Sequence, residues 1–372
     1  MQFSISSADL KEQLQIISGA ISSNPILPIL EDFLFKIENG TLTISATDNQ
    51  TFMITSMPVE SDEDGCVAIP AKILLDTLRQ LPTQPLKFAI DLDSFAVSVT
   101  SQFGQYKMAG EDGNDFPRIP SPDNVDSIEI PSPVLLEGIN KTLFAVSHND
   151  SQVAMTGVFV QINSEGLVFV ATDAHKLVKY AFSDIDTSLD GAFILPQKPL
   201  HLLKNALANS TQAVTVTYND TTAIFKFADQ ILACRLIDEN YPNYGAVIPA
   251  DNPNSISITR SDLLNSLKRI ANYANKTTNQ VKLDISDSSL TIEAEDLDFS
   301  NKATEQLPCF YDGEAMSIGF NAKFLIEMLN TIGGDNIRIE LSSPNRAGIL
   351  RTEEQVPEED LLMLVMPVML NV

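Results

Sequence analysis

One pattern of residues returns three times along the chain, and this repeat constrains the fold more than any other feature. Strand-like segments that end in an acidic turn occur around Asp48, Asp173 and Asp296, at intervals of about 125 residues. The middle copy is the most complete: residues 166–178 alternate apolar side chains with period two and then break at the turn. Three copies in a chain of 372 residues predict three domains of similar fold.

A second repeated unit, a strand followed by a helical pattern, has the same period. It carries a lysine near the start of its helix in each third, at Lys72, Lys198 and Lys323. Together with the strand–helix unit that opens each third, it predicts two helices per domain among the strands, an α+β fold whose sheets need one covered face. Turn-rich linkers predict domain boundaries that give residues 1–125, 126–253 and 254–372.

The composition is that of an ordinary globular protein, with 44% hydrophobic and 20% charged residues. No apolar run approaches the roughly 18 residues of a membrane span, and the first residues lack the basic and apolar blocks of a signal peptide. The three cysteines are far apart, which favours reduced thiols over a disulfide framework or a metal site. We expect a cytoplasmic protein with no membrane partner.

No catalytic or cofactor-binding motif stands out in the sequence. The histidines His148, His175 and His201 lack metal-ligand spacing, and we find no Walker loop, dinucleotide fingerprint or nucleophile elbow. Asp173 and His175 admit two readings, an acid–base pair or a turn aspartate that caps its own backbone. The turn is favoured because the repeated acidic position lacks a matching histidine in the other copies. We therefore expect no enzyme activity, no cofactor and no metal.

Charge is distributed unevenly between the predicted helices and the rest of the chain. The formal net charge of −25 argues against a generally basic nucleic-acid surface. The six repeated helices nevertheless hold eleven Lys and Arg residues against six acidic ones, a net of +5. They are either ordinary solvated helix faces or the lining of one weakly positive surface that holds a polyanion without sequence preference.

The whole chain resembles a known family, and six short segments in the right order carry the resemblance. They are Ile-Leu-Pro-Ile-Leu at 26–30, Asp-Phe-Pro at 115–117, Val-Ala-Thr-Asp-Ala-His-Lys-Leu at 170–177, Asp-Glu-Asn-Tyr-Pro-Asn-Tyr at 238–244, Ile-Gly-Phe-Asn at 318–321 and Val-Met-Pro-Val-Met-Leu at 365–370. The chain is similar to the bacterial β sliding clamp, the processivity subunit of DNA polymerase III. The resemblance implies three domains of the DNA clamp fold, each with two helices inside and antiparallel sheets outside. It also implies a head-to-tail homodimer that closes into a ring.

The function implied by this resemblance is non-catalytic. The ring would encircle duplex DNA, bind it topologically and without sequence preference, and tether the replicative polymerase, which confers processivity. The implied partners are double-stranded DNA, a second copy of the chain, the catalytic subunit of DNA polymerase III, the clamp loader, other polymerases, mismatch-repair proteins and ligase. The protein partners would bind through short apolar peptides. The implied location is the bacterial cytoplasm, at the nucleoid during replication.

Site residues carry over from the family by position. The partner-peptide pocket would be formed by Met155, Thr172, Ala174, His175, Lys176, Leu177, Pro242, Val247, Leu364, Val365, Met366 and Pro367. The DNA-facing residues would be Lys72, Arg79, Lys141, His148, Asn149, Lys198, Lys204, Lys268, Arg269 and Lys323. Tyr106 and Tyr273 would lie at the contact between the two copies. Methionine and aliphatic side chains suit a surface that accepts several different peptides.

The chain departs from the family pattern at a few positions. Asn24 and Gln152 stand where arginines are common, Ala174 replaces a frequent glycine, and Lys176 replaces an arginine. Two further residues, Asn371 and Val372, follow the usual end of the chain. Peptide preference and the hold on DNA are expected to depend on these positions.

Two other classes of function stay open on the residues alone. One is a three-domain hydrolase or nuclease that uses the acidic turns with a divalent metal, which metal-dependent turnover of DNA would reveal. The other is a cytosolic scaffold that binds peptides but no DNA. The apolar segment 361–372 likewise has two readings, a final strand docked in a sheet or part of an apolar groove open to partners.

Overall fold

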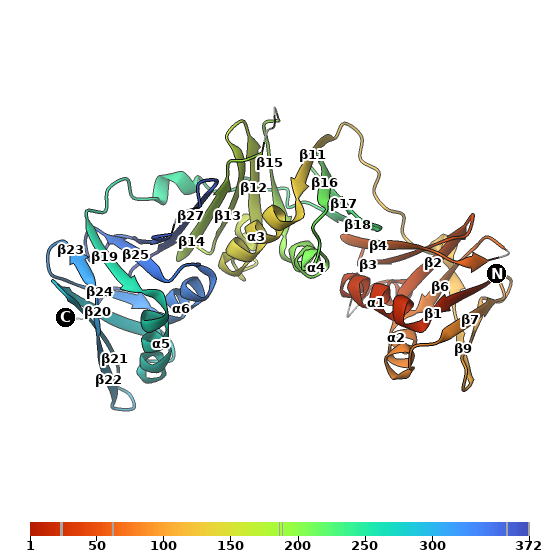
Figure 1. Cartoon of the computed structure of the whole chain (residues 1–372), viewed down its shortest axis with the longest axis horizontal. Coiled ribbons are helices and arrows are strands. Elements are labelled where there is room, and N and C mark those ends of the chain that lie inside the picture. Colours follow the sequence, from red (N-terminus) through yellow and green to blue (C-terminus); the bar gives the residue numbers. More distant parts are fainter. Residues whose placement is uncertain (23–24, 62, 186, 188, 355, 371–372) are drawn as a thin grey trace. The chain divides into compact units, whose positions relative to one another are not determined.

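The described chain repeats one order of secondary structure three times. The computed structural model describes residues 1–22, 25–61, 63–185, 187, 189–354 and 356–370. Within these residues each copy runs strand, helix, four strands, helix, three strands, and short extra strands of two or three residues are added in the first and third copies (Figure 1). This order confirms the threefold repeat and the α+β class that the sequence predicted.

Six α-helices, two in each copy, occur in the described part of the chain. They are α1 (Ser7–Ile17), α2 (Ala71–Gln80), α3 (Ser132–Thr142), α4 (Gln197–Leu207), α5 (Arg260–Ile270) and α6 (Ala322–Thr331). The sequence predicted longer helices, but short 3-10 turns follow α1, α3 and α5, so that Lys276 lies beyond the end of α5. Each helix is amphipathic; in α2, for example, Leu74 and Leu78 are buried while Lys72 and Arg79 are exposed.

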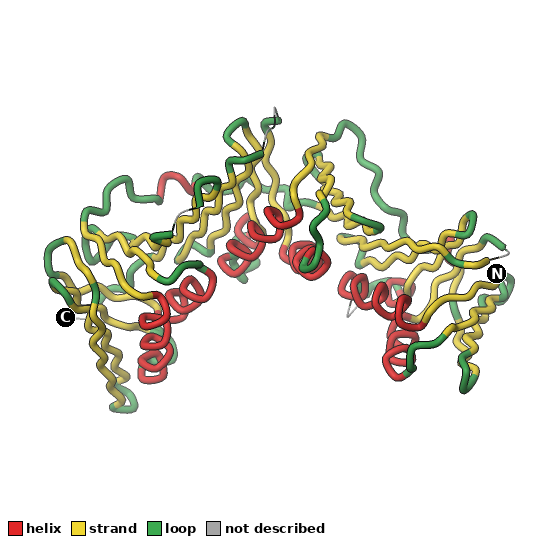
Figure 2. Tube along the Cα trace, viewed as in Figure 1, coloured by secondary structure: helices red, strands yellow, loops and turns green. Residues whose placement is uncertain are grey.

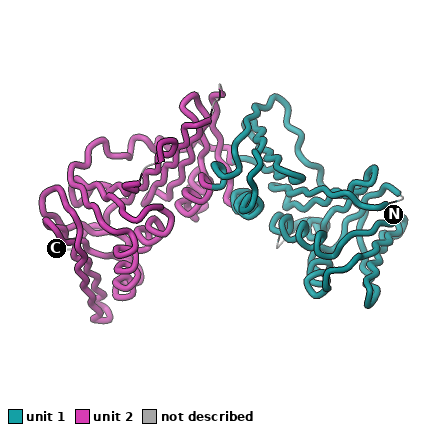
Figure 3. Tube along the Cα trace, in the orientation of Figure 1, with its two compact units in different colours: residues 1–136, 198–236 teal, residues 137–197, 237–372 magenta. Residues whose placement is uncertain are grey.

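The chain divides into two compact units, residues 1–136 with 198–236 and residues 137–197 with 237–372 (Figure 3). The first unit holds two antiparallel sheets. One has the order β5 (Glu60–Ser61), β1 (Gln2–Ser6), β7 (Pro85–Ile90), β8 (Ala96–Thr100), β9 (Gln105–Ala109). The other has the order β10 (Glu111–Asp112), β6 (Gly65–Pro70), β2 (Asp32–Glu38), β3 (Thr41–Thr47), β4 (Thr51–Pro58), β18 (Gln230–Arg235), β17 (Thr222–Phe227), β16 (Ala213–Tyr218), β11 (Asp126–Pro131).

The second unit is built in the same way from one longer and one shorter sheet. The longer sheet has the order β15 (Gly191–Pro196), β12 (Gly157–Asn163), β13 (Gly166–Thr172), β14 (Lys176–Phe182), β27 (Glu359–Val365), β26 (Gly348–Thr352), β25 (Asn336–Leu341), β19 (Asn254–Thr259), β23 (Phe310–Asp312). The shorter sheet has the order β22 (Asn301–Pro308), β21 (Ser289–Asp296), β20 (Gln280–Ser286), β24 (Met316–Asn321).

Each of the longer sheets joins two copies of the repeat. β4 of the first copy pairs antiparallel with β18 of the second, with Met53 opposite Leu232. β14 of the second copy pairs antiparallel with β27 of the third, with Leu177 opposite Leu364. In the order of the repeat β4 and β14 are equivalent strands, and so are β18 and β27. The two joints therefore follow one rule, which is why each compact unit combines a terminal third with half of the middle third.

In both units the helices pack on one face of the sheets, as Figure 2 shows. α1 packs against α2 in the first unit, and α5 packs against α6 in the second. The apolar face of α1 presents Leu10, Leu14 and Ile17, which are fully buried against strands that include β3 and β4. Burial of each such side chain contributes roughly 2 kcal/mol. The opposite faces of the helices carry the charged residues.

Candidate functional site

The turn between β13 and β14 is shaped by the carboxylate of Asp173. Its Oδ1 accepts hydrogen bonds from the backbone N–H groups of His175, at 2.9 Å, and Lys176, at 2.8 Å. Asp48 closes the equivalent turn of the first copy in the same way, with the N–H groups two and three residues further on. This confirms the prediction that the repeated aspartate caps its own turn.

Ala174 occupies a left-handed backbone position in this turn, with φ of +71°. The equivalent residue of the first copy is Asn49, with φ of +73°, and asparagine tolerates this conformation better than most residues. An L residue with a Cβ pays roughly 1–2 kcal/mol there, whereas glycine does not. The alanine that replaces the family's frequent glycine therefore leaves strain in a turn that carries several of the predicted pocket residues.

Lys176 points away from solvent and toward α6. Its side chain is only 6% exposed, and its ammonium lies 2.8 Å from Oδ2 of Asp173 and 3.2 Å from Oε2 of Glu327. The same ammonium lies 4.4 Å from the centre of the Phe324 ring, against which the exposed His175 ring is stacked. Lys176 thus fastens the turn to α6, and its charge is used inside the protein.

The C-terminal segment after β27, residues 366–370 and here called the tail, continues past this turn. The N–H of Met366 donates to the carbonyl oxygen of His175 at 2.8 Å, and the N–H of Val368 donates to that of Gly319 at 2.8 Å. Beneath it Leu177 and Leu364 are opposed in the β14–β27 ladder and are buried in one apolar cluster. The reading of a final strand docked in a sheet is therefore confirmed for the part of the segment in β27, and the reading as an apolar groove open to partners stays a prediction.

The twelve residues predicted for the peptide pocket all belong to the second unit, where they divide into a floor and a rim. The buried floor consists of Thr172, Lys176, Leu177, Leu364 and Val365. The remaining residues are half-buried or exposed: Met155, Ala174, His175, Pro242, Val247, Met366 and Pro367. The turn, β27 and the tail are connected by the hydrogen bonds above, and the segment around residues 241–248 packs on the same apolar cluster. Met155 lies in the 3-10 turn before β12, and its carbonyl oxygen accepts a hydrogen bond from the N–H of Ser147, a residue outside the predicted set.

Sequence reasoning missed several aromatic residues beside this surface. Tyr241 stacks on Phe159 with ring centroids 4.6 Å apart, and Tyr244 meets the same ring edge-on. The hydroxyl of Tyr244 donates to Oε1 of Gln161 at 2.5 Å, and burial raises the pKa of Tyr241. Two of these residues lie in the 238–244 segment that carried the resemblance. The third, and Phe324 under His175, had no signal beyond apolar periodicity.

The helices carry most of the residues predicted to face DNA. Ten Lys and Arg residues and six acidic residues lie on them, a net of +4, because the predicted helix that held Lys276 ends earlier. Four of the predicted cations already have acidic partners: Arg79 with Asp76, Lys141 with Glu137, Lys198 with Asp48 and Arg269 with Glu305.

The other residues predicted to face DNA differ from these four because they form no ion pair with a described carboxylate. Lys72, Lys204, Lys268 and Lys323 are exposed, and none forms an ion pair with a residue in the described ranges. His148 and Asn149 are also exposed, in the loop after α3. These four lysines are therefore the predicted DNA-facing cations whose charge no described carboxylate partner neutralises.

Tyr106 and Tyr273, predicted for the contact between copies, lie in different units. Tyr106 is on β9 and lines a hollow of about 630 Å³ beside α2, together with Ile73, which is 52% exposed. Tyr273 directly follows α5 and is 45% exposed. Neither is part of a buried core, so both are accessible in the single chain.

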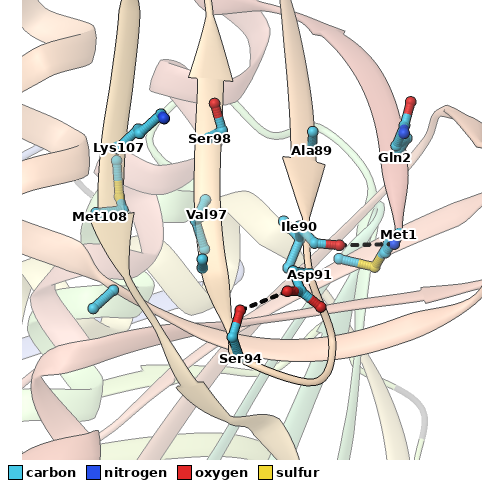
Figure 4. A pocket seen from close by; sticks show the side chains of 12 residues that line it. Met1, Gln2, Ala89, Ile90, Asp91, Ser94, Val97, Ser98, Lys107 and Met108 are labelled. Carbon is cyan, nitrogen blue, oxygen red and sulfur yellow. Dashed lines mark hydrogen bonds between the residues drawn. The ribbon is translucent and has the colours of Figure 1, made fainter.

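A second hollow, of about 690 Å³, opens over the ends of β1, β7, β8 and β9 (Figure 4). Met1 lies at its rim, where its amino group donates to the carbonyl oxygen of Ile90 at 2.9 Å, and Ser94 donates to Asp91 at 2.7 Å. No residue predicted for the peptide pocket or the DNA-facing surface lines it. It adjoins β9, an outer strand of its sheet.

Three of the departures noted in the sequence, Asn24, Asn371 and Val372, lie outside the described residues. Gln152 is half-buried, and its Oε1 accepts a hydrogen bond from Ser147 at 2.9 Å. Among the residues that the structure describes, no three His, Cys, Asp or Glu side chains are grouped so as to hold a metal ion. None of the described helices has the length and apolar character needed to cross a membrane.

Comparison with known proteins gives one consistent result along the whole chain. The family models for the DNA polymerase III beta subunit match in order: the N-terminal domain at residues 1–120, the central domain at 129–243 and the C-terminal domain at 245–369. The beta sliding clamp of Synechococcus elongatus is 30% identical over 373 residues, which cover 98% of each chain. That of Escherichia coli K12 is 27% identical over 92% of this chain and 93% of its own.

Solved structures agree in fold. A DNA polymerase sliding clamp from Bacillus subtilis superposes with a TM-score of 0.94 at 24% identity and covers all of both chains. A sliding clamp from Pseudomonas aeruginosa, solved bound to griselimycin, gives the same TM-score and coverage at 24% identity. Taken with the domain matches and the relative at 30% identity, these likenesses identify the chain as a member of the DNA polymerase III beta subunit family, the bacterial sliding clamps.

Proposed function

We propose that two copies of this chain close head to tail into a ring that encircles duplex DNA and tethers the replicative polymerase, without catalysis of its own. In this proposal the domains are residues 1–125, 126–253 and 254–372, with the helices lining the bore. The partners are the polymerase III catalytic subunit, the clamp loader and other replication and repair proteins that carry short apolar peptides. The site of action is the cytoplasmic nucleoid.

The observation that supports the ring most strongly is a strand pairing between copies of the repeat that the single chain does not form. β4 pairs with β18 and β14 pairs with β27, so the fourth β-strand of one copy meets the last strand of the next. By the same rule β22 should meet β9, yet these are outer strands of separate sheets. Those sheets have four and five strands, so that joining them would give nine, as in the two sheets already joined. A second copy of the chain supplies the missing partner for each edge.

The backbone of both outer strands is free to pair on its open side. In β9 the register with β8 and the bond from the Gly110 N–H to the Phe95 carbonyl oxygen show that the backbone N–H and C=O groups of even-numbered residues point toward β8. The N–H of Lys107 therefore faces the open edge. In β22 the bond from the Cys309 N–H to the Ser288 carbonyl oxygen shows that the backbone groups of odd-numbered residues point toward β21. The N–H of Thr304 therefore points to the open edge of the sheet.

The ring is tested by removing one edge donor and measuring mass in solution. Thr304 is exposed, and Thr304→Pro deletes its outward N–H while it leaves the ladder to β21 intact. We expect wild type to have the mass of two chains and Thr304→Pro that of one, by light scattering at equal concentration. Thr304→Val keeps the N–H and the branched side chain, and is the matched control that should stay dimeric. A monomeric wild type, or a proline variant that stays dimeric, would contradict the ring as proposed.

The peptide site is supported by the surface made of the 172–177 turn, the 241–248 segment and the tail. Met366 and Val247 are 41% and 54% exposed beside a floor that includes the buried Leu177 and Leu364. His175 is exposed in the turn between β13 and β14. Exposed apolar side chains over such a floor usually mark an interaction surface. Removing residues 366–372, which spares β27 with its buried Leu364 and Val365, should leave the fold but abolish stimulation of the polymerase. Unchanged stimulation would reject this site while leaving the ring untouched.

A further inference from the structure

The motif at 318–321 is left unexplained by the ring, the peptide site and the DNA-facing helices, and its glycine is unusual. Gly319 lies inside β24, where a glycine weakens a strand because it adds backbone entropy and no side chain to pack. Its backbone is not in the left-handed region, so its conformation is open to any residue. A buried glycine in such a position usually marks a close approach of other backbone.

The close approach at Gly319 is made by the C-terminal segment. A Cβ built on Gly319 would lie 2.6 Å from the carbonyl oxygen of Val368 and 2.8 Å from Cδ2 of Leu370. The leucine side chain can rotate away, but the carbonyl oxygen belongs to backbone that forms a β-bridge with Gly319. Ordinary contact between a methyl group and an oxygen needs about 1 Å more than this gap provides. Any side chain at Gly319 would therefore displace the tail.

Displacement of the tail at Val368 would be passed on to the peptide surface. The N–H of Val368 is bonded to Gly319, and two residues earlier the N–H of Met366 is bonded to the carbonyl oxygen of His175. Pro367 lies between these two anchors, and its ring restricts φ, so little of the shift can be absorbed there. The half-exposed Met366 and Pro367 stand where the tail is held, in the second compact unit.

We propose that Gly319 is a positioning residue for the partner-peptide pocket: by lacking a side chain, it lets the C-terminal segment lie against the open edge of β24 and so sets the places of Met366 and Pro367. This inference rests on the proposed peptide site and adds to it a residue that lies outside the set carried over from the family. Gly319 touches the tail and acts on the peptide only through it.

The test compares two glycines of the same domain. Gly319→Ala introduces the clash, whereas Gly333→Ala places its methyl group where no atom lies within 4 Å and is the matched control. The probe is a fluorescently labelled peptide with the clamp-binding segment of the polymerase III catalytic subunit, and binding is followed by anisotropy. We expect Gly319→Ala to weaken binding about tenfold, as loss of one well-placed anchor does, and Gly333→Ala to leave it unchanged. Equal affinity of wild type and Gly319→Ala would overturn the proposal.

A second pair of proteins separates action through the tail from a local defect in β24. Wild type and Gly319→Ala are each truncated after Pro367, which removes the segment that Gly319 accommodates. If the glycine acts through the tail, Gly319→Ala should have no further effect on peptide affinity in the truncated chain. A tenfold loss that persists there would assign the effect to β24 itself and reject the positioning role. Solution mass and thermal unfolding of each full-length variant should match the Gly333→Ala control.

Failure of the peptide site is distinguishable from failure of this inference. If wild type does not bind the probe at all, the proposed site is wrong, and the place of the tail is then measured directly by carboxypeptidase digestion. Faster release of Leu370 and Met369 from Gly319→Ala than from Gly333→Ala would support the contact between the glycine and the tail. Equal release rates would contradict it.

Discussion

Substitution of Lys176 by methionine gives the sharpest view of how the predicted pocket is held together. Methionine replaces the aliphatic part of the side chain and removes only the ammonium group. That group is nearly fully buried and bridges Asp173, Glu327 and the ring of Phe324. The substitution therefore leaves a mostly buried carboxylate without its cation, which is the costly way to break an ion pair.

The magnitude follows from the exposure of the three partners. Loss of one partner of a buried pair costs about 3–5 kcal/mol, but Asp173 keeps two backbone N–H donors, which lowers this figure. Glu327 is 45% exposed, so its share is below about 1 kcal/mol. The contact with Phe324 adds about 1 kcal/mol. We expect Lys176→Met to lower the free energy of unfolding by about 2–3 kcal/mol.

The assay is urea unfolding, with Lys204→Met as the matched control because Lys204 is exposed on α4. That control should change stability by less than about 0.5 kcal/mol. A double-mutant cycle should give a coupling of at least about 1.5 kcal/mol between Lys176 and Asp173, and less than about 1 kcal/mol between Lys176 and Glu327. A loss from Lys176→Met as small as that of the control would refute the view that this lysine fastens the turn to α6.

Three further outcomes follow from single residues. Ala174→Gly removes a Cβ at positive φ and should stabilise the protein by about 1 kcal/mol in urea unfolding, whereas no gain would mean that the turn is unstrained. Burial, with Glu111 nearby, raises the pKa of Asp32 from 3.8 to about 7. The protonated carboxyl of Asp32 therefore makes its full contribution to the stability of the fold below pH 4, and this contribution is lost as the pH rises through 7. Asp32→Asn should stabilise at pH 8 by up to about 4 kcal/mol and by nothing at pH 4; a gain independent of pH would reject this. Lys268→Ala should weaken DNA binding and lower its salt dependence more than Arg269→Ala does, because the arginine is already paired; equal effects would count against that ranking.

Much of the fold was predictable because the repeat is written in residue types with direct physical meaning. Alternating apolar residues gave the strands, and Asp48 and Asp173 marked turns that the structure closes by the predicted backbone capping. Helix ends were less predictable, because the residues that follow α1, α3 and α5 include no proline that would end a helix, yet the backbone tightens into 3-10 turns there. Propensity alone does not separate these two conformations.

The candidate site was predictable as a set of positions but not as an arrangement. The sequence assigned Lys176 to the pocket, and nothing in it revealed that Glu327 and Phe324, about 150 residues away, hold its ammonium. In the same way, counts of Lys and Arg treated Arg269 and Lys268 alike, although only the first is bound to a carboxylate. The first pairing depends on the joint between β14 and β27, and the second on how α5 packs against β22. Periodicity within a single helix or strand carries no information about either.

Formation of a ring around DNA is tested most directly by comparing how long the protein is retained on circular and on linear DNA. The protein is loaded by a clamp loader onto nicked circular DNA, separated from free protein by gel filtration, and the DNA is then cut once. We expect that the protein stays with the circle in high salt and is released when the circle is linearised, because the hold is topological and the helices are only weakly positive. Loss from the intact circle in high salt, or equal retention on circular and linear DNA, would contradict it.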